Sequence, residues 1–411
     1  MPWTVKIYFV VGALLMLQSA WAFVDGLRFL RLVRRKRTSR WGTYTPYAAV
    51  VIPCKGVDSG FHENVGRFLN QDYSNYQVVF VVASARDSAY QSLRGRLEAP
   101  VAPGPNCEVR ASLIVAGISD ERGEKVNNLL RGVEAVDQGA DVLAFADIDA
   151  VPSPHWLRCL VAPLADSQIT VSTGFRWYLP GEGFASRLRA AWDTSIATLM
   201  GEHDHNFAWG GSMAIRTRDF RKLGIAERYW AKTLSDDYAL TRAVGEARGR
   251  IVFEPRCLVA SREESSLRDF LRWSTRQIII TRVYAPRRWK LGLASYLLYC
   301  GTFALGLIAT ALPGPTPYQR LAVAITLLAV LLLGAGKGSI RSLVTRDLFA
   351  AEIGKRVSCY WQLSPLVPWV MLFNFVVAGF TRRIEWRGTE YELVSRDQVR
   401  VIRRIGGREC S

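Results

Sequence analysis

The chain has 411 residues, of which 49% are hydrophobic, and it carries a formal net charge of +17. This length allows two or three domains, and the positive charge favours anionic partners such as nucleotide phosphates or an anionic lipid surface. The seven cysteines are scattered and odd in number, which argues against a disulfide framework and a zinc site. Nucleic-acid binding would explain the charge but not the long apolar segments, so no nucleic-acid partner is expected.

The first apolar stretch, residues 7–24, is long enough to span a bilayer. A cleavable signal peptide is the alternative, because Ala20-Trp21-Ala22 resembles a cleavage site. Seven basic residues follow between positions 28 and 40, however, and such a cluster stays on the cytoplasmic side of a membrane. We therefore expect an uncleaved anchor over residues 1–27 with its N-terminus outside, and then a basic cytoplasmic linker over residues 28–46.

Residues 47–290 have the pattern of one soluble α/β domain. Short β-branched apolar runs alternate with polar, helix-like stretches; the runs cover residues 48–52, 78–82, 113–115 and 142–146. Continuous apolar strands predict a sheet with parallel strands that is covered on both faces. In such a sheet the ligand site lies beyond the carboxyl ends of the strands.

Membrane segments are expected over residues 291–380. They comprise a clear span at 291–312, a short one at 321–335 and a third apolar run at 366–380. If all three crossed, the arginine-rich tail over residues 381–411 would lie outside, against the positive-inside rule. We therefore expect the run at 366–380 to be re-entrant or interfacial, or to span together with the weaker segment 340–360. The protein is then a multi-pass membrane protein with a cytoplasmic tail.

Asp147 and Asp149 follow the apolar run 142–146 directly. Residues i and i+2 of an extended chain point the same way, so both carboxylates can approach one hard divalent cation, which shares its oxygen ligands with substrate phosphates. Such a metal stabilises the negative charge on a departing nucleotide. The alternative is that the pair only caps the turn before Pro152.

A second acidic pair, Asp236 and Asp237, stands at the predicted N-terminus of a helix through residues 239–244. Capping of that helix would explain the pair without a function. The functional interpretation makes one of the two carboxylates a general base for an acceptor hydroxyl.

A further helix brings Asp269, Arg272, Trp273 and Arg276 onto one face. An arginine can bind a diphosphate with two hydrogen bonds, and the tryptophan can stack against a sugar or an acceptor. A basic amphipathic helix lying on anionic lipid would show the same pattern.

These motifs, in this order between an anchor and C-terminal membrane segments, resemble the ceramide glucosyltransferase family of membrane-bound, inverting nucleotide-sugar transferases. Further stretches carry the resemblance, and they are Pro53-Cys54-Lys55-Gly56-Val57-Asp58, Gln71 to Tyr76, Glu124 to Leu129, Gly210 to Arg216 and Ile384-Glu385-Trp386-Arg387-Gly388. The family implies a GT-A (Rossmann-like) catalytic domain between the membrane helices. It covers most of residues 47–290 and the tail.

The resemblance implies a role for each matching residue. Asp147 and Asp149 would hold Mn²⁺ or Mg²⁺, and Asp237, beside Asp236, would deprotonate the acceptor hydroxyl. Arg272 and Trp273 would close over diphosphate and acceptor. The remaining donor contacts would come from Lys55, Lys125, Asn128, Gly211 and Arg276. The donor would be a UDP-sugar such as UDP-glucose, and the acceptor a membrane lipid, ceramide-like or other, reached from an anionic cytoplasmic leaflet (of the inner membrane in a bacterium).

Two positions depart from the family pattern. The family's first functional aspartate aligns with Ser84, with Asp87 three residues on as the substitute, and Asp269 stands where glutamine or arginine is expected. The alternative functions are a polysaccharide synthase, a polyprenyl-phosphate glycosyltransferase and, in another class, an inactive nucleotide- or lipid-binding membrane protein.

Overall fold

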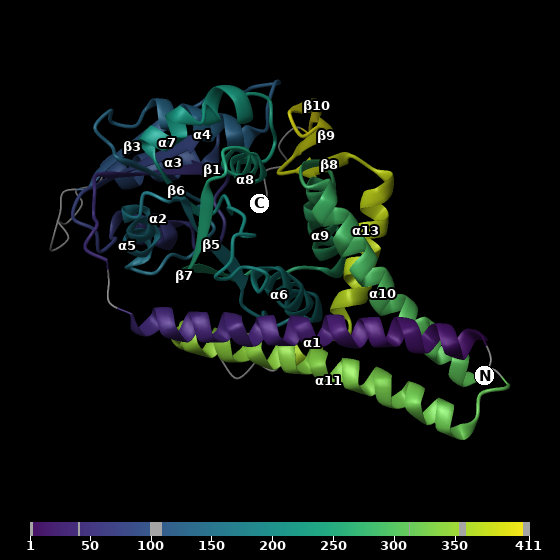
Figure 1. Cartoon of the computed structure of the whole chain (residues 1–411). Helices are drawn as coiled ribbons and strands as arrows, with labels where there is room; N and C mark the ends of the chain where they lie inside the picture. Colours follow the sequence, from purple (N-terminus) through teal and green to yellow (C-terminus); the bar gives the residue numbers. More distant parts are fainter. Residues whose placement is uncertain (1–2, 40–41, 99–108, 312, 353–358, 406–411) are drawn as a thin grey trace. The chain divides into compact units, whose positions relative to one another are not determined.

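The computed structural model describes residues 3–39, 42–98, 109–311, 313–352 and 359–405 (Figure 1). The chain forms two compact units. One, here called the sheet unit, comprises Arg35–Trp177, Met200–Ser261 and Arg382–Ser411. The other, here called the helical unit, comprises Met1–Arg34, Tyr178–Leu199 and Arg262–Thr381.

The sheet unit contains a seven-stranded sheet with the strand order β3-β2-β1-β4-β6-β5-β7. The strands are β1 (Ala48–Cys54), β2 (Tyr76–Val82), β3 (Arg110–Val115), β4 (Val142–Ala146), β5 (Ile169–Tyr178), β6 (Ser212–Arg216) and β7 (Arg250–Ser261). Strands β1 to β4 are parallel, whereas β6 is antiparallel to both β4 and β5. The α/β fold predicted from the sequence is thereby confirmed.

Helices cover both faces of this sheet. They are α2 (Phe61–Leu69), α3 (Ser88–Glu98), α4 (Glu124–Glu134), α5 (Trp156–Val161), α7 (Thr217–Lys222) and α8 (Asp236–Glu246), with a 3₁₀ turn at Ala162–Ala165 and a π turn at Ile225–Tyr229. Successive side chains of a strand point to opposite faces, so Val50 of β1 joins one apolar cluster and Val51 the other. This two-sided burial explains the continuous apolar runs of β1, β2 and β4. Strand β3 lies at the edge and is partly exposed.

The chain returns to the sheet unit at its C-terminal end. Residues 383–404 form a small antiparallel sheet of β8 (Arg383–Trp386), β9 (Thr389–Ser395) and β10 (Gln398–Arg404). Its backbone is tied to the rest of the sheet unit, since the N–H of Val399 donates to the carbonyl of Lys232 over 3.0 Å. The arginine-rich tail is therefore a folded part of the sheet unit.

The helical unit is built from long helices. They are α6 (Phe184–Ala197), α9 (Leu267–Tyr284), α10 (Pro286–Ala311), α11 (Pro317–Leu348), α12 (Cys359–Gln362) and α13 (Val367–Phe380), with a 3₁₀ turn at Ala350–Glu352; α1 (Trp3–Thr38) begins in this unit. Among the described residues, three helices are long and apolar enough to cross a membrane: Val5–Thr38, Pro286–Ala311 and Pro317–Leu348.

Helices α1 and α11 lie side by side and run parallel (Figure 1). The hydroxyl of Tyr8 donates to the carbonyl of Val323 over 3.1 Å, and the guanidinium of Arg34 pairs with Asp347 over 2.8 Å. Because partners near the start and near the end of each helix match, both helices have the same direction.

The short span expected at 321–335 is only the first half of α11. Lys337 follows its apolar part, but the helix continues to Leu348, so residues 340–348 are not a separate segment. Small residues let other chain segments approach closely here: a Cβ on Gly338 would lie 2.4 Å from the Cα of Trp361. This tertiary packing supports the helix beyond its apolar part.

Gly132 offers a test of how α4 packs on the sheet. A Cβ there would lie 2.4 Å from the Cγ1 of Val51 and 2.9 Å from the Cγ2 of Val81, and buried β-branched side chains have little freedom to move. Gly132→Ala should therefore lower the free energy of unfolding by about 1–3 kcal/mol, as measured by tryptophan fluorescence on heating.

The matched control is Gly66→Ala, because a Cβ on Gly66 in α2 would meet nothing within 4 Å. There the higher helix propensity of alanine should leave stability unchanged or raise it by up to about 1 kcal/mol. Equal effects of the two substitutions would contradict the packing described for α4.

Candidate active site

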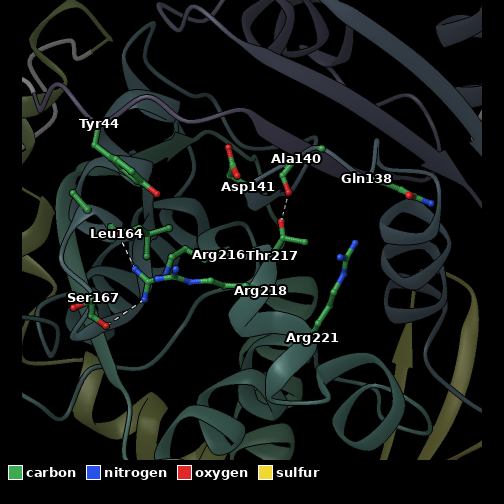
Figure 2. Close-up of a pocket in the computed structure, with 12 residues that line it drawn as sticks. Tyr44, Gln138, Ala140, Asp141, Leu164, Ser167, Arg216, Thr217, Arg218 and Arg221 are labelled. Carbon is green, nitrogen blue, oxygen red and sulfur yellow. Dashed lines mark hydrogen bonds between the residues drawn. The ribbon is translucent and has the colours of Figure 1, made fainter.

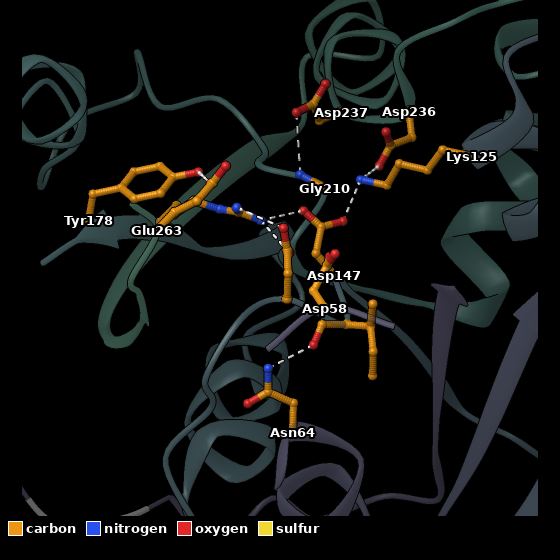
Figure 3. A network of polar contacts seen from close by, with 12 residues as sticks. Asp58, Asn64, Lys125, Asp147, Tyr178, Gly210, Asp236, Asp237 and Glu263 are labelled. Carbon is orange, nitrogen blue, oxygen red and sulfur yellow. Dashed lines mark hydrogen bonds and ion pairs between the residues drawn. The ribbon is translucent and has the colours of Figure 1, made fainter. Parts of the chain in front are cut away.

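The loop after β4 places Asp147 and Asp149 at the carboxyl end of the parallel strands. It is a turn rather than an extended segment, because the N–H of Ala150 donates to the carbonyl of Asp147 over 3.1 Å. The amide of Asn64 donates to the carbonyl of Ile148 over 2.9 Å (Figure 3), and the side chain of Ile148 is buried in the core. Asn64 and the buried Ile148 thus hold the loop in place, while its two carboxylates remain partly exposed.

Both carboxylates reach one cationic group. The Nη2 of Arg176 in β5 lies 3.0 Å from Oδ2 of Asp147 and 2.7 Å from Oδ1 of Asp149. Burial alone would raise the pKa of Asp149, but the charge and hydrogen bonds of Arg176 lower it to about 2. Asp149 is therefore ionised at neutral pH, and the pair is shaped to share a cation.

Asp147 and Asp149 together could supply two oxygen ligands to a divalent metal ion. Hard cations take oxygen ligands and often complete their shell with water and substrate phosphates. The described residues contain no group of three or more His, Cys, Asp or Glu side chains that could hold a metal. The remaining ligands would therefore have to come from a bound diphosphate and water.

Lys125 of α4 connects the two acidic pairs (Figure 3). Its Nζ lies 2.8 Å from Oδ1 of Asp147 and 3.3 Å from Oδ2 of Asp236. Burial would lower the pKa of Lys125, but the carboxylates of Asp147, Asp236 and Asp237 together raise it. Lys125 is therefore charged, and it joins the end of β4 to the start of α8.

Asp236 and Asp237 have different surroundings at the start of α8. Ser235 is the N-cap, and its hydroxyl accepts from the N–H of Tyr238. Asp236 is 3% exposed, whereas Asp237 is partly exposed and its Oδ2 accepts from the N–H of Gly210 over 3.3 Å. Asp237 is thus the member of the pair that solvent or a substrate can reach.

Two glycines allow the carboxylates to come this close. A Cβ on Gly210 would lie 2.0 Å from Oδ2 of Asp236, and one on Gly211 would lie 2.7 Å from Oδ2 of Asp147. The loop before β6 therefore needs residues without side chains at these positions.

The remaining candidates of the sheet unit lie near the same edge of the sheet. Lys55, just after β1, pairs with Glu124 over 2.9 Å, next to Lys125. Ser84 and Asp87 follow β2, and Oδ1 of Asp87 accepts from the N–H of Gly56 and of Ala89. This carboxylate therefore links the loop after β1 to the start of α3.

Asn128 lies one turn after Lys125 in α4 and is 2% exposed. Its Oδ1 is buried and has no hydrogen-bond partner among the residues that the structure describes. An unpaired buried acceptor is costly unless a ligand or water satisfies it.

Arg272, Trp273 and Arg276 belong to α9 of the helical unit. Trp273 packs edge-on against Tyr178 and Trp192, and the guanidinium of Arg189 lies 4.3 Å from its ring centroid. Arg272 is exposed. Asp269 accepts a hydrogen bond from the hydroxyl of Ser266, the N-cap of α9, so the acid that departs from the family pattern stabilises the start of this helix.

Two arginines near the carboxylates were not predicted from the sequence. Arg176 lies between two aromatic residues of β5, Phe175-Arg176-Trp177, and a charge in this position was the available signal. Arg387 lies in the tail, and its Nη2 is 3.3 Å from Oδ2 of Asp58 and 3.9 Å from Oδ2 of Asp149.

A cavity of about 440 Å³ lies elsewhere in the sheet unit (Figure 2). It is lined by residues before β1 and β4, such as Tyr44 and Asp141, and by Arg216 at the end of β6. Arg216 donates to the carbonyls of Leu164 and Ile169. None of the residues predicted for the site lines this cavity, which lies at the amino end of the parallel strands.

Asp236 generates a prediction about pH. Burial raises the pKa of its carboxyl to about 7, so the folded protein binds this proton more tightly than the unfolded chain does. The resulting stabilisation is complete below the unfolded pKa near 4 and is lost as the pH rises to about 7. Wild type should therefore lose stability relative to Asp236→Asn between about pH 4 and pH 7, by up to about 4 kcal/mol.

Thermal unfolding at a series of pH values measures this difference. Asp204→Asn, in an exposed turn, controls for the removal of one negative charge. If wild type and Asp236→Asn followed parallel courses over this range, the buried carboxyl would not hold a proton as described.

Several solved structures resemble the chain at low identity. A mannosyltransferase from Pyrobaculum calidifontis, in complex with GDP-Man and Mn²⁺, is 17% identical over 90% of this chain and 97% of its own, with a TM-score of 0.44. Glucosyl-3-phosphoglycerate synthase from Mycobacterium tuberculosis is 16% identical over 61% and 82%, with a TM-score of 0.37. S. aureus TarS 1–349 with UDP-GlcNAc is 12% identical over 84% and 96%, with a TM-score of 0.38. Likenesses this distant do not determine a substrate.

The sequence itself gives the assignment. The family model described as Glycosyl transferase family 21 matches residues 9–399, which is nearly the whole chain. The match includes most of α1, both acidic pairs, α9, the C-terminal helices and most of the tail. The chain therefore belongs to glycosyl transferase family 21, the family of the ceramide glucosyltransferases, and is a glycosyltransferase.

Proposed function

We propose that the protein transfers a sugar from a nucleotide sugar, such as UDP-glucose, to the hydroxyl of a membrane lipid, with inversion at the anomeric carbon. The observation that carries this proposal is the arrangement around Lys125. Its ammonium lies between Asp147 and Asp236, so the carboxylates suited to the donor and those suited to the acceptor form one site. The family assignment supports the same chemistry.

The donor would bind through its diphosphate at Asp147 and Asp149. These residues would hold Mn²⁺ or Mg²⁺, and the ion supplies positive charge to the leaving diphosphate when bound. Lys125 would orient Asp147 and contact the donor. The buried Oδ1 of Asn128 would accept a hydrogen bond from a donor hydroxyl, and Lys55, Ser84, Asp87 and Gly211 would line the nucleotide side of the site.

Asp237 would be the general base. Its Oδ1 accepts from Ser235 Oγ and from the N–H of Tyr238 over 2.7 Å, which fixes the carboxylate. It would take the proton of the acceptor hydroxyl as the oxygen attacks the anomeric carbon and the nucleoside diphosphate leaves. Asp236 is buried and would assist through Lys125. Arg272, Trp273 and Arg276 would act on diphosphate and acceptor, as the family pattern implies.

A lipid acceptor is supported by the three helices that could cross a membrane. The tail 383–404 belongs to the sheet unit, which supports a topology in which the chain between residues 262 and 381 would cross an even number of times. Helices α10 and α11 would account for two crossings. Helix α13 has 14 residues and measures about 21 Å, which is shorter than a bilayer core of about 30 Å; α13 would therefore not cross.

Sugar transfer is the direct test of this function. Membranes carrying the protein would be incubated with radiolabelled nucleotide sugars and their own lipid extract. A glycolipid should form, EDTA should abolish it, and Asp147→Asn and Asp237→Asn should each lower kcat by about 10²-fold or more. Asp204→Asn is the control, because this exposed residue carries the same charge. Nucleotide binding without transfer would instead indicate an inactive binding protein.

The membrane topology can be tested separately. In a cysteine-free background, Thr316→Cys in the turn before α11 and Ser395→Cys in the tail would be probed in intact cells with a membrane-impermeant maleimide. Thr316→Cys should react at once, whereas Ser395→Cys should react only after permeabilisation. Reaction of both in intact cells would mean that α13 crosses the membrane.

A further inference from the structure

We propose that the β8–β9 hairpin of the tail is part of the donor site and that Arg387, at its turn, binds the diphosphate of the nucleotide sugar. This inference rests on the proposed function. It assigns a substrate contact to a residue that lies 238 positions after Asp149, in a tail for which the sequence predicted no substrate contact.

The turn that carries Arg387 has an unusual residue for its geometry. Strands β8 and β9 pair with Trp386 opposite Thr389, which leaves a two-residue turn. Both turn residues have positive φ, 44° for Arg387 and 76° for Gly388. Such turns favour asparagine, aspartate and glycine, and other residues rarely adopt positive φ. An arginine in this conformation costs conformational energy, and residues held in such conformations are concentrated at functional sites.

Two contacts fix the position of the tail within the sheet unit, one from β9 and one from the turn between β9 and β10. The hydroxyl of Tyr391 accepts from the N–H of Glu124, and Asp397 pairs with Arg242 of α8. Glu124 begins α4, which carries Lys125, and α8 carries both Asp236 and Asp237. The tail is therefore fastened to the same two helices that hold the candidate site.

Arg387 contacts residues of the donor side. Its Nη1 donates to the carbonyl of Lys55, and its Nη2 lies 3.3 Å from Asp58 and 3.9 Å from Asp149. The side chain remains 39% exposed, so an incoming anion can reach it. A guanidinium offers a planar set of donors that matches phosphate oxygens.

Arg404 pairs with Asp120 outside the tail, but two other arginines of the tail have acidic partners within the tail itself. Arg400 pairs with Glu392 over 3.1 Å, and Arg403 pairs with Glu390 over 2.9 Å. Such exposed pairs contribute little. The acidic partners of Arg387 are instead Asp58, in the loop after β1, and Asp149, in the loop after β4. A diphosphate bound there would bring its negative charge within reach of this guanidinium.

Binding of nucleoside diphosphates to the full-length protein tests the inference. With Mn²⁺ present, the dissociation constants of UDP, GDP and uridine would be measured for wild type, Arg387→Ala, Arg387→Lys and the matched control Arg403→Ala. Arg387→Ala should weaken binding of the diphosphate by about tenfold or more and leave uridine binding unchanged. Arg387→Lys should have a smaller effect, and Arg403→Ala should resemble wild type.

The outcomes separate this inference from the proposed function. If wild type bound neither UDP nor GDP, the proposed function would fail and this inference with it. If wild type bound a diphosphate and Arg387→Ala bound it equally well, only the role of Arg387 would be overturned. A loss of diphosphate and uridine binding together, with a lower Tm, would show that Arg387 merely holds the tail in place.

The contact between Arg387 and the diphosphate can also be tested on wild type, in case the variants fail to fold. Phenylglyoxal modifies exposed arginines, and the modified positions can be located by mass spectrometry. UDP or GDP with Mn²⁺, whichever binds, should protect Arg387 and leave Arg403 reactive, whereas uridine should protect neither. Equal modification of Arg387 with and without the diphosphate would contradict the proposed contact.

Discussion

The ion pairs that Lys125 makes with Asp147 and Asp236 are the interactions on which the candidate site depends. Four carboxylates gather at one edge of the sheet, from the loop after β4 and from the start of α8. Like charges this close repel each other, and burying them uncompensated is costly. Lys125 and Arg176 supply the opposing charge, so the acidic cluster can exist in the folded protein before any ligand arrives.

The backbone around the site also lets the carboxylates lie close together. Gly210 and Gly211 leave no side chain where the carboxylates of Asp236 and Asp147 lie. Asn64 and the buried side chain of Ile148 hold the loop after β4 from the opposite side. The site is therefore positioned by the core of the sheet unit, and its chemistry depends on residues from α4, β4, β5 and α8 together.

The sequence predicted those features that depend on local pattern. Continuous apolar runs gave β1, β2 and β4, and the ordered motifs led to the family. Arg176 was not found, because it is 27 residues from Asp149 and only the antiparallel strand pairs bring the two together. The full length of α11 was missed for a similar reason. Its charged second half is supported by neighbouring segments that are distant in the sequence.

The tail has a consequence for the order in which the protein is made. It contacts Glu124, Lys232 and Arg242, yet it is translated after all the helices of the helical unit. Because a ribosome synthesises the chain from the N-terminus, the sheet unit obtains its final strands only after the helices of the helical unit have been made. The sheet unit is thus completed only after the long apolar helices have been synthesised, and a chain that terminated early would lack part of the sheet unit rather than a dispensable extension.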